Sequence, residues 1–259
     1  MIKKLISLLF SLLVCTLFCV QSLAWGPIGH YTIGQLAEWQ MKPATLERVD
    51  EVLQRESIAG VGTWMDQVRS DTTYDYTRTW HWLTTVDGKY DPAIQEENGD
   101  AYAAFLTLRE NLKSGKLSEE EERVQLKFLI HIVADLHQPL HVGQPGDRGG
   151  NDVRVYWFGE STNLHRVWDT HLVESRRMSF SELAAELQRR ITPEMAKEYE
   201  SASPSDWLVE AVELRPYIYD IPENGRLGYN YIYNYFHIVE ERLIAAGIRL
   251  AKVLEDIYG

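Results

Sequence analysis

Two histidine–aspartate pairs with the same spacing carry the chemistry that can be read most directly from this sequence. In FLIHIVADLHQPLH, His131 and Asp135 lie four residues apart, and in NLHRVWDT, His165 and Asp169 repeat that spacing. Residues four apart on a helix project from the same face, one turn from each other. Imidazole and carboxylate groups held in this way are the ligands that zinc prefers in proteins. The two pairs therefore predict a metal site.

A single pair of this kind is weak evidence, because histidine and aspartate at this spacing more often form a hydrogen bond on a helix surface. The first pair, however, lies in a strongly apolar stretch, 128–133. A carboxylate on a buried face is unfavourable unless it is paired or bound to metal. Pro139 should end this helix and leave His141 free to fold back toward the pair. The two pairs and this third histidine together favour metal binding.

The remaining histidines and acidic residues are less informative on their own. We interpret His137 as a residue that supports the ligands or lies on the surface, and His171 and His237 as structural. Asp66 in GTWMDQVR and His81 in TWHWLTTV gain weight only from the rest of the pattern.

The elements that must position these residues are mostly helical. Apolar residues recur at three- and four-residue spacing in 28–39, 43–54, 101–112, 122–137, 181–190 and 231–257. Strand signals are confined to 80–86 and to 153–157, which follows a turn-forming Gly-Gly-Asn-Asp. Segment 215–229, with two prolines and two glycines, is predicted to be a loop long enough to edge a cleft. The fold class is mainly α, a single-domain helical bundle with a small β hairpin.

Residues 1–24 have the pattern of a secretory signal peptide. Lys3 and Lys4 precede an apolar run over 5–20, and small residues end at Ala24. The run is short for a membrane span, which needs about 20 residues. We therefore expect cleavage after Ala24, a domain of residues 25–259, a secreted or periplasmic protein and no stable membrane association after cleavage.

Composition narrows the classes of protein further. The formal net charge is −12, which argues against a broad basic surface for nucleic acid. Both cysteines precede Ala24, so the exported chain would have no disulfide and would depend on its core or on bound metal. Eight tryptophans and fourteen tyrosines predict an aromatic core.

The chain resembles the S1/P1 family of zinc-dependent, single-strand-specific nucleases. WGPIGH, WMDQVR, WHW, FLIHIVADLHQPLH, GGND and NLHRVWD carry the resemblance, in that order, from Trp25 onward. It implies the fold of zinc-dependent phospholipase C, with three zinc ions in a cleft, so a phospholipase C-like phosphodiesterase is the alternative. In the phospholipases the first histidine lies further from the tryptophan and the last ligand is a glutamate. Here the gap is five residues and the last ligand is Asp169, which favours the nuclease.

The resemblance implies one set of ligands for each zinc ion. The first set is Asp66, His81, His131 and Asp135, and the second is His141, His165 and Asp169. The third is the free amine and carbonyl oxygen of Trp25, with His30 and a shared Asp135, so that signal cleavage would complete the metal centre. Three divalent ions would also give an acidic chain a locally cationic site.

Other residues take roles from the same resemblance. Asp135 and Arg69 would be catalytic, with Arg69 stabilising charge on the phosphorus, and Trp82 and Asn151 would bind substrate. The alternative for Arg69 is a surface salt bridge, and for Trp82 it is core packing. Thr84 stands where fungal members carry an aspartate that hydrogen-bonds the base, so base preference is left open.

The implied activity is hydrolysis of phosphodiester bonds in single-stranded DNA and RNA by an endonuclease that leaves 5′-phosphate ends. Whether nucleotides are also substrates, through a 3′-nucleotidase activity, stays open. A non-catalytic zinc-binding protein is the third hypothesis; it would need a blocked coordination position, which the ligand set does not suggest. We expect a monomer.

Overall fold

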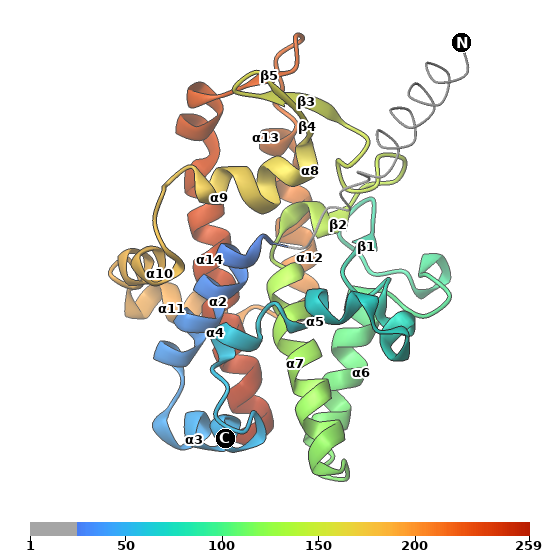
Figure 1. Cartoon of the computed structure of the whole chain (residues 1–259), viewed down its shortest axis with the longest axis vertical. Helices are drawn as coiled ribbons and strands as arrows, with labels where there is room; N and C mark the ends of the chain where they lie inside the picture. The colour runs from blue at the N-terminus through green and yellow to red at the C-terminus, as the bar shows by residue number, and fades with distance from the viewer. Residues whose placement is uncertain (1–24) are drawn as a thin grey trace, which may run out of the picture.

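The structure, a computed structural model, describes residues 25–259. The predicted signal peptide, residues 1–24, lies outside the described residues. Helices make up most of the described chain and only short strands accompany them (Figure 1), which confirms the mainly α fold class. Within residues 25–259, none of the helices has both the length and the apolar character that a membrane crossing requires.

Four long helices form the frame of the molecule. They are α2 (Pro27–Gln40), α6 (Ala101–Lys113), α7 (Glu119–Asp135) and α14 (Tyr229–Tyr258). Helix α14 runs along most of the length of the molecule and packs against α2 and α7 (Figure 1). At Gly247, helix α14 comes so close to α2 that a Cβ atom added to this glycine would lie 2.5 Å from the Cβ of Leu36. Glycine at this position therefore sets the distance between α14 and α2.

Shorter helices cover this frame. They are α3 (Pro43–Val52), α4 (Ile58–Val61), α5 (Trp64–Gln67), α8 (Leu164–Arg166), α9 (Leu172–Glu174), α10 (Phe180–Gln188), α11 (Pro193–Ser201), α12 (Pro204–Glu213) and α13 (Arg215–Ile218). The six predicted helical segments are confirmed as α2, α3, α6, α7, α10 and α14. Helices α11 and α12 were not predicted. Each begins with a proline after a Thr or Ser cap, which is a start signal for a helix.

Two small sheets complete the fold. Strands β1 (Leu83–Thr84) and β2 (Val142–Gly143) pair in parallel, with Leu83 opposite Val142. The strand predicted over 80–86 is thus only two residues long. Its first residues instead form a turn, in which the Trp80 indole N–H donates to the carbonyl of Asn98.

The predicted hairpin is confirmed as β3 (Arg154–Trp157) and β4 (Glu160–Asn163), which pair antiparallel. Phe158 and Gly159 join them with φ angles of 49° and 95°, the left-handed backbone that a tight two-residue hairpin turn requires. A third strand, β5 (Arg226–Leu227), pairs in parallel with β3.

The prediction of a loop over 215–229 is wrong. The segment contains helix α13, strand β5 and the start of α14. Pro216 is compatible with α13 because it lies in the first helical turn, where no amide hydrogen is needed. Gly225, with a φ of 67°, makes the turn that leads into β5.

Candidate metal centre

The C-terminal end of α7 carries the first predicted pair. A capping box between Ser118 and Glu121 starts this helix, and its last ten residues are all buried. His131 and Asp135 are both 0% exposed, and His131 Nε2 lies 3.1 Å from Asp135 Oδ2. The helix ends at Asp135, four residues before Pro139, as predicted. The chain then turns so that His141 faces the same carboxylate, with Nδ1 3.7 Å from Asp135 Oδ1.

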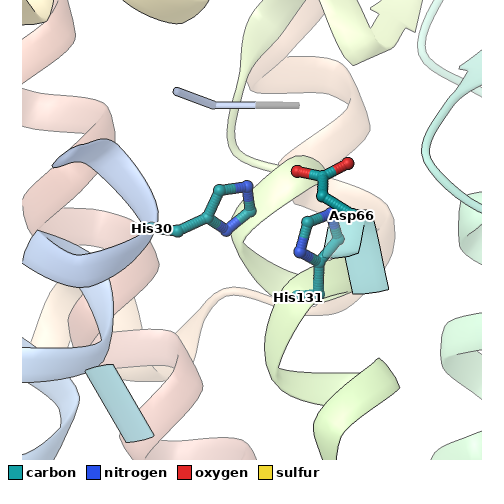
Figure 2. Close-up of side chains that lie close together, drawn as sticks. All are labelled: His30, Asp66 and His131. Carbon is teal, nitrogen blue, oxygen red and sulfur yellow. The ribbon is translucent and has the colours of Figure 1, made fainter. Parts of the chain in front are cut away.

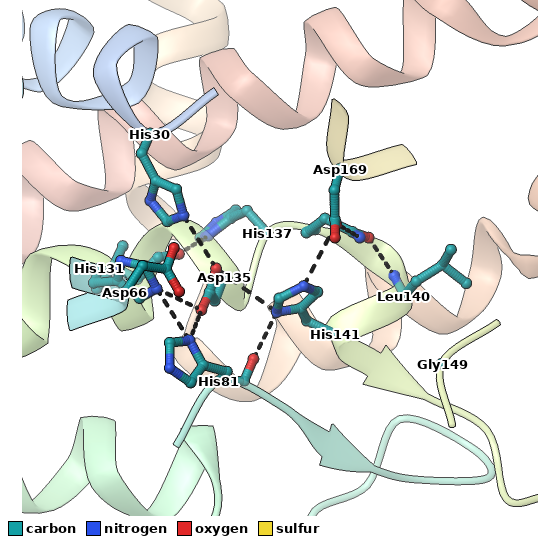
Figure 3. A network of polar contacts seen from close by, with 12 residues as sticks. His30, Asp66, His81, His131, Asp135, His137, Leu140, His141, Gly149 and Asp169 are labelled. Carbon is teal, nitrogen blue, oxygen red and sulfur yellow. Dashed lines mark hydrogen bonds and ion pairs between the residues drawn. The ribbon is translucent and has the colours of Figure 1, made fainter. Parts of the chain in front are cut away.

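Two further histidines, from distant parts of the chain, complete the surroundings of Asp135 (Figure 3). His81 Nδ1 lies 3.1 Å from Asp135 Oδ2, and His30 Nε2, from α2, lies 3.5 Å from Asp135 Oδ1. The His30 ring stacks on that of His131 with centroids 4.1 Å apart. His81, His131 and Asp135 bring one ligand atom each within 4.8 Å of one another.

Asp66 enters the same cluster from α5 (Figure 2). Its carboxylate groups with His30 and His131, again with one ligand atom each within 4.8 Å. The resemblance placed Asp66 with His81, His131 and Asp135, so the structure adds His30 to its neighbours. His131 belongs to both groups.

The second predicted pair forms a neighbouring group. His165 Nε2 lies 3.0 Å from Asp169 Oδ2, and His141 Nε2 lies 3.6 Å from Asp169 Oδ1. The pair is on a helical segment, but the turn at Val167–His171 is a wide π turn rather than a regular α turn. Such turns are rare and often occur at functional sites.

Backbone carbonyl groups fix the orientation of three of the imidazole rings. In His131, His141 and His165 the Nδ1–H donates to a carbonyl oxygen at 2.6–2.7 Å, which leaves Nε2 directed at the cluster. The acceptors are Gly62, His81 and Gly149. Gly149 has a φ of 61°, and a Cβ atom there would lie 2.3 Å from the carbonyl oxygen of Leu140. Only glycine can therefore present this carbonyl to His165.

Several polar atoms of the cluster are buried and have no hydrogen-bond partner among residues 25–259. They are both ring nitrogens of His30, Oδ1 of Asp66, Oδ1 of Asp135 and Nε2 of His141. A buried polar atom without a partner is unfavourable, and most such atoms in proteins are satisfied. Histidine nitrogens and carboxylate oxygens are also the donor set of a zinc site. The residues present therefore fit a bound metal.

The charges within the cluster shift the pKa values in opposite directions. Burial and the neighbouring His131 hold the pKa of His30 well below its usual range. Burial would also lower the pKa of His141, but Asp135 and Asp169 outweigh it and raise that pKa to about 9. Burial opposes ionisation of Asp135, yet the charges of His131 and His141 keep its pKa well below normal. Because a metal ligand must offer an unprotonated nitrogen, the raised pKa of His141 means that metal would compete with a proton at this residue.

Comparison with known proteins identifies the family. Residues 25–259 match the family model described as S1/P1 Nuclease. The chain belongs to the S1/P1 nuclease family. Endonuclease 3 and Endonuclease 4 of Arabidopsis thaliana are 30% and 29% identical to it, over 96% and 95% of this chain and 94% and 93% of their own. Nuclease S1 of Aspergillus oryzae is 26% identical over 74% of this chain and 69% of its own.

Membership confirms the resemblance seen in the sequence. S1/P1 nucleases are metal-dependent hydrolases of phosphodiester bonds, and the histidine–aspartate groups of this chain are candidate sites for that metal. The match also favours the nuclease over the phospholipase C alternative. The roles of individual residues are a separate matter and rest on geometry.

Arg69 and Trp82 lie beside the predicted metal ligands Asp66 and His81. Arg69 Nη1 is 3.6 Å from Asp66 Oδ1, so an ion pair is present, but its partner is a predicted metal ligand. Trp82 follows His81 directly and is 37% exposed, which does not fit the alternative of plain core packing. Asn151 lies two residues from Gly149, and its side-chain amide donates to the carbonyl of Arg148.

Trp25 is fully buried at the start of the described chain. The next residue, Gly26, donates its N–H to the backbone carbonyl of Asp169 at 2.7 Å. A Cβ atom at Gly26 would lie 3.0 Å from that same carbonyl oxygen. The fold therefore ties the backbone next to Trp25 to the segment that carries the second pair.

Within residues 25–259, the other three histidines are not among the candidate metal-binding groups. The surface alternative for His137 is wrong: it is 0% exposed, with Nδ1 2.8 Å from the carbonyl of Val133 and Nε2 3.2 Å from Arg249 Nη1. His171 is half-buried and stacks on Trp157. His237 is exposed on α14.

Sequence reasoning missed Arg215. Its guanidinium donates to the carbonyl oxygens of Thr85, Val86, Val142 and Gly143 at 2.8–3.0 Å. It thereby holds β1 to β2, the strands that directly follow Trp82 and His141. No motif marks Arg215, and its contacts depend on two strands more than 70 residues away. Only the Arg-Pro start of a helix could have drawn attention to it.

Proposed function

We propose that the protein is an endonuclease that hydrolyses phosphodiester bonds of single-stranded DNA and RNA, with three zinc ions as its cofactor and products that carry 5′-phosphate ends. The main support is the set of buried histidine nitrogens and carboxylate oxygens that have no hydrogen-bond partner among residues 25–259. The family, and relatives named as endonucleases, support the reaction class.

The proposed ligands are those of the sequence analysis. Asp66, His81, His131 and Asp135 would hold one ion, and His141, His165 and Asp169 a second. The third would be held by His30, Asp135 and the amine and carbonyl of Trp25, once the chain is cleaved after Ala24 and exported. When bound, zinc supplies Lewis-acid stabilisation of phosphoryl charge and makes water nucleophilic at neutral pH.

The protein's own side chains have distinct tasks in this proposal. Asp135 supplies a permanent negative charge among four histidines, which keeps cations in place. Arg69 is 24% exposed in its side chain and can donate to a phosphoryl oxygen as charge develops there. Trp82 offers a ring face next to the cluster, and a base stacked on such a ring contributes ~1–3 kcal/mol.

Burial of the ligands supports the preference for single strands. Asp135 and His131 are 0% exposed and His141 only 2%, so a phosphodiester must bend inward to reach them. A flexible single strand can do so, whereas a stacked duplex resists such bending. Thr84 gives no carboxylate for base recognition, so we propose no base preference.

The test uses purified protein that begins at Trp25. Matched single- and double-stranded DNA and RNA are incubated with and without chelator, and zinc is measured by elemental analysis. We expect about three zinc per chain, rapid cleavage of single strands, slow cleavage of duplex and complete loss with chelator. Equal cleavage of duplex, or one zinc or none, would contradict the proposal. Hydrolysis of liposomes but not of single strands would restore the phospholipase alternative.

A further inference from the structure

We propose that a cavity where helices α6, α11, α12 and α14 meet binds a small oxyanion such as phosphate, at a site separate from the metal centre. The residues that line the cavity include Arg109, Tyr199, Trp207, Arg249, Lys252 and Asp256. None of these residues belongs to the candidate metal groups. The inference goes beyond the proposed function and does not depend on it.

The size of the cavity suits a small ion. Its volume is about 70 Å³, and one water needs about 10–15 Å³ of such space. The cavity can therefore hold a few water molecules or one tetrahedral ion such as phosphate, whereas a nucleoside is too large. The side chains of Arg109 and Lys252 are 27% and 39% exposed, which leaves the cavity accessible from solvent.

Two buried N–H groups at the cavity have no acceptor among residues 25–259. They are the indole N–H of Trp207, a residue that is 2% exposed, and the Nε–H of Arg109. Both groups can only donate. Among the buried side-chain atoms of the lining residues in the described chain, no acceptor is left unpartnered in this way. Since buried polar groups are normally satisfied, the cavity is suited to a ligand that supplies acceptors.

The carboxylates at the cavity are too few for its basic side chains. Asp256 is shared between two of them, because its Oδ2 lies 3.5 Å from Arg109 Nη2 and its Oδ1 accepts from Lys252 Nζ. Glu200 and Asp206 are also close by, but both are exposed, so that water screens their charges. A ligand in the cavity would therefore meet mainly positive charge.

The same imbalance continues in the protein interior behind the cavity. Glu210 is shared between Arg249 and Arg242, at 2.5 and 2.6 Å. These arginines are only 2% and 5% exposed. Together with Asp256, two carboxylates thus serve four cations, in a chain whose net charge is −12. Buried positive charge is unfavourable unless it is balanced, and a bound anion would balance it.

Arg249 is fixed in place beside the cavity. Its guanidinium lies 5.2 Å from the centroid of the Tyr199 ring and 5.6 Å from that of Trp207, and its Nε–H donates to the Tyr199 carbonyl at 3.2 Å. A cation that is already ordered loses little freedom when an anion binds. Water alone could accept from the two free N–H groups, but it would not balance the charge. An oxyanion does both, and arginine is well suited to bind one.

The indole N–H of Trp207 gives a direct test by nuclear magnetic resonance. Its proton–nitrogen resonance is assigned in the metal-loaded protein by its loss in Trp207→Phe. Inorganic phosphate should shift this resonance downfield in the parent, because the N–H gains a charged acceptor, and should leave it in place in Arg109→Gln at the same concentration. Sodium chloride at equal ionic strength is the control for screening. No shift with phosphate, or an equal shift with chloride, would overturn the site.

Calorimetric titration with inorganic phosphate measures the affinity in the same proteins. The Kd of the cavity should rise tenfold or more in Arg109→Gln, which loses a charge-assisted hydrogen bond, and about fivefold in Trp207→Phe, which loses a neutral one. Arg189→Gln removes an 80% exposed arginine that does not line the cavity and is the matched control. Phosphate bound by zinc contributes equally in all four proteins. Equal affinity in the parent and both cavity variants would overturn the proposal.

A nucleoside 5′-monophosphate, titrated in the same way, identifies the source of the oxyanion. An effect of Arg109→Gln on phosphate alone would assign the site to the free ion, and an equal effect on both ligands would assign it to the phosphate end of a nucleotide. If Trp207→Phe fails to fold, Arg109→Gln still decides, because its side chain is partly exposed. Cleavage of single strands by the parent is a separate measurement, so failure of this inference leaves the proposed function intact.

Discussion

Two largely buried polar clusters lie near each other at the C-terminal end of α7, and they differ in where their histidines find partners. The metal centre surrounds Asp135. The second cluster surrounds His137, only two residues further, and we call it the arginine network: His137, Glu210, Arg242 and Arg249. Glu210 accepts from Arg242 at 2.6 Å and from Arg249 at 2.5 and 2.7 Å. Arg242 also donates to the backbone carbonyl of His137.

In the arginine network the protein itself supplies the partners. Both ring nitrogens of His137 have one, and among the buried side-chain atoms of the network only Nη2 of Arg242 has no hydrogen-bond partner in the described part of the chain. In the metal centre, nitrogens of His30 and His141 and oxygens of Asp66 and Asp135 have no hydrogen-bond partner within residues 25–259. Burial of a histidine therefore does not identify a ligand. Neighbouring buried polar atoms without a hydrogen-bond partner are the better indication of a metal ligand.

The pKa values express the same contrast. Burial, together with Arg242 and Arg249, holds the pKa of His137 well below its usual range, so the ring is a neutral acceptor. In His141 the nearby carboxylates overcome burial and raise the pKa to about 9. One histidine lies among cations and the other among anions. Only the second environment attracts a metal ion.

The largest expected effect comes from Asp135→Asn, which breaks the metal centre while keeping its shape. The amide removes the negative charge that balances the ions, so activity should fall by several orders of magnitude and zinc content should drop. His137→Gln is the control from the arginine network and should retain zinc and most activity. Similar losses in the two variants would remove the distinction between the clusters.

A residue added before Trp25 tests the proposed third metal site, in which the free amine of Trp25 is a ligand. An acylated nitrogen has no lone pair to offer, so a protein with one extra methionine should contain about two zinc and lose most of its activity. Zinc stoichiometry and cleavage of single-stranded DNA are compared with protein that begins at Trp25. Full activity of the extended form would show that Trp25 is only a packed aromatic residue.

Arg249→Met tests the arginine network through stability. The change leaves the partly buried Glu210 with fewer partners, and breaking a buried pair of this kind costs about 3 kcal/mol. Urea unfolding should show this loss, while zinc content and kcat of the folded enzyme stay near those of the parent. Arg190→Met removes a more exposed ion pair with Glu240 and should cost at most about 1 kcal/mol. Equal destabilisation in both variants would contradict the special role of the network.

The smallest expected effect is the pH dependence of stability that Glu210 contributes. Burial opposes ionisation of Glu210, but hydrogen bonds and charge from Arg249 and Arg242 lower its pKa below the usual 4.5. The folded protein therefore binds this proton less readily than the unfolded chain. Its contribution to stability is complete above about pH 4.5 and is lost as pH falls through the folded value. We compare unfolding of the parent and of Glu210→Gln between about pH 3 and 6, a range that extends about one unit or more to either side of 4.5. As the pH falls, the free energy of unfolding should decline more steeply in the parent.

Much of the fold and of the candidate metal centre could be predicted from the sequence because these features depend on residues that are close together in the chain. The helix that ends before Pro139, the two four-residue spacings and the hairpin turn all depend on neighbouring residues. The structure brings the side chains of His30, Asp66, His81, His131, Asp135, His141, His165 and Asp169 together in two adjoining groups, although their roles as ligands stay predictions. Arg215, the two-residue length of β1 and the partners of His137 depend on contacts between distant segments, which spacing along the chain does not encode.

The close packing at Gly247 has a consequence for when the centre can form. Helix α14 follows all the proposed ligands in the sequence, and it supports α2, which carries His30. A ribosome adds about 5–20 residues per second, from the N-terminus, so every proposed side-chain ligand emerges well before the helix that fixes α2. Contacts between the two ends of a chain also form slowly, because a long loop must close first. The nascent nuclease would thus carry all the proposed side-chain ligands without a finished centre, and its activity would begin only after α14 has packed against α2.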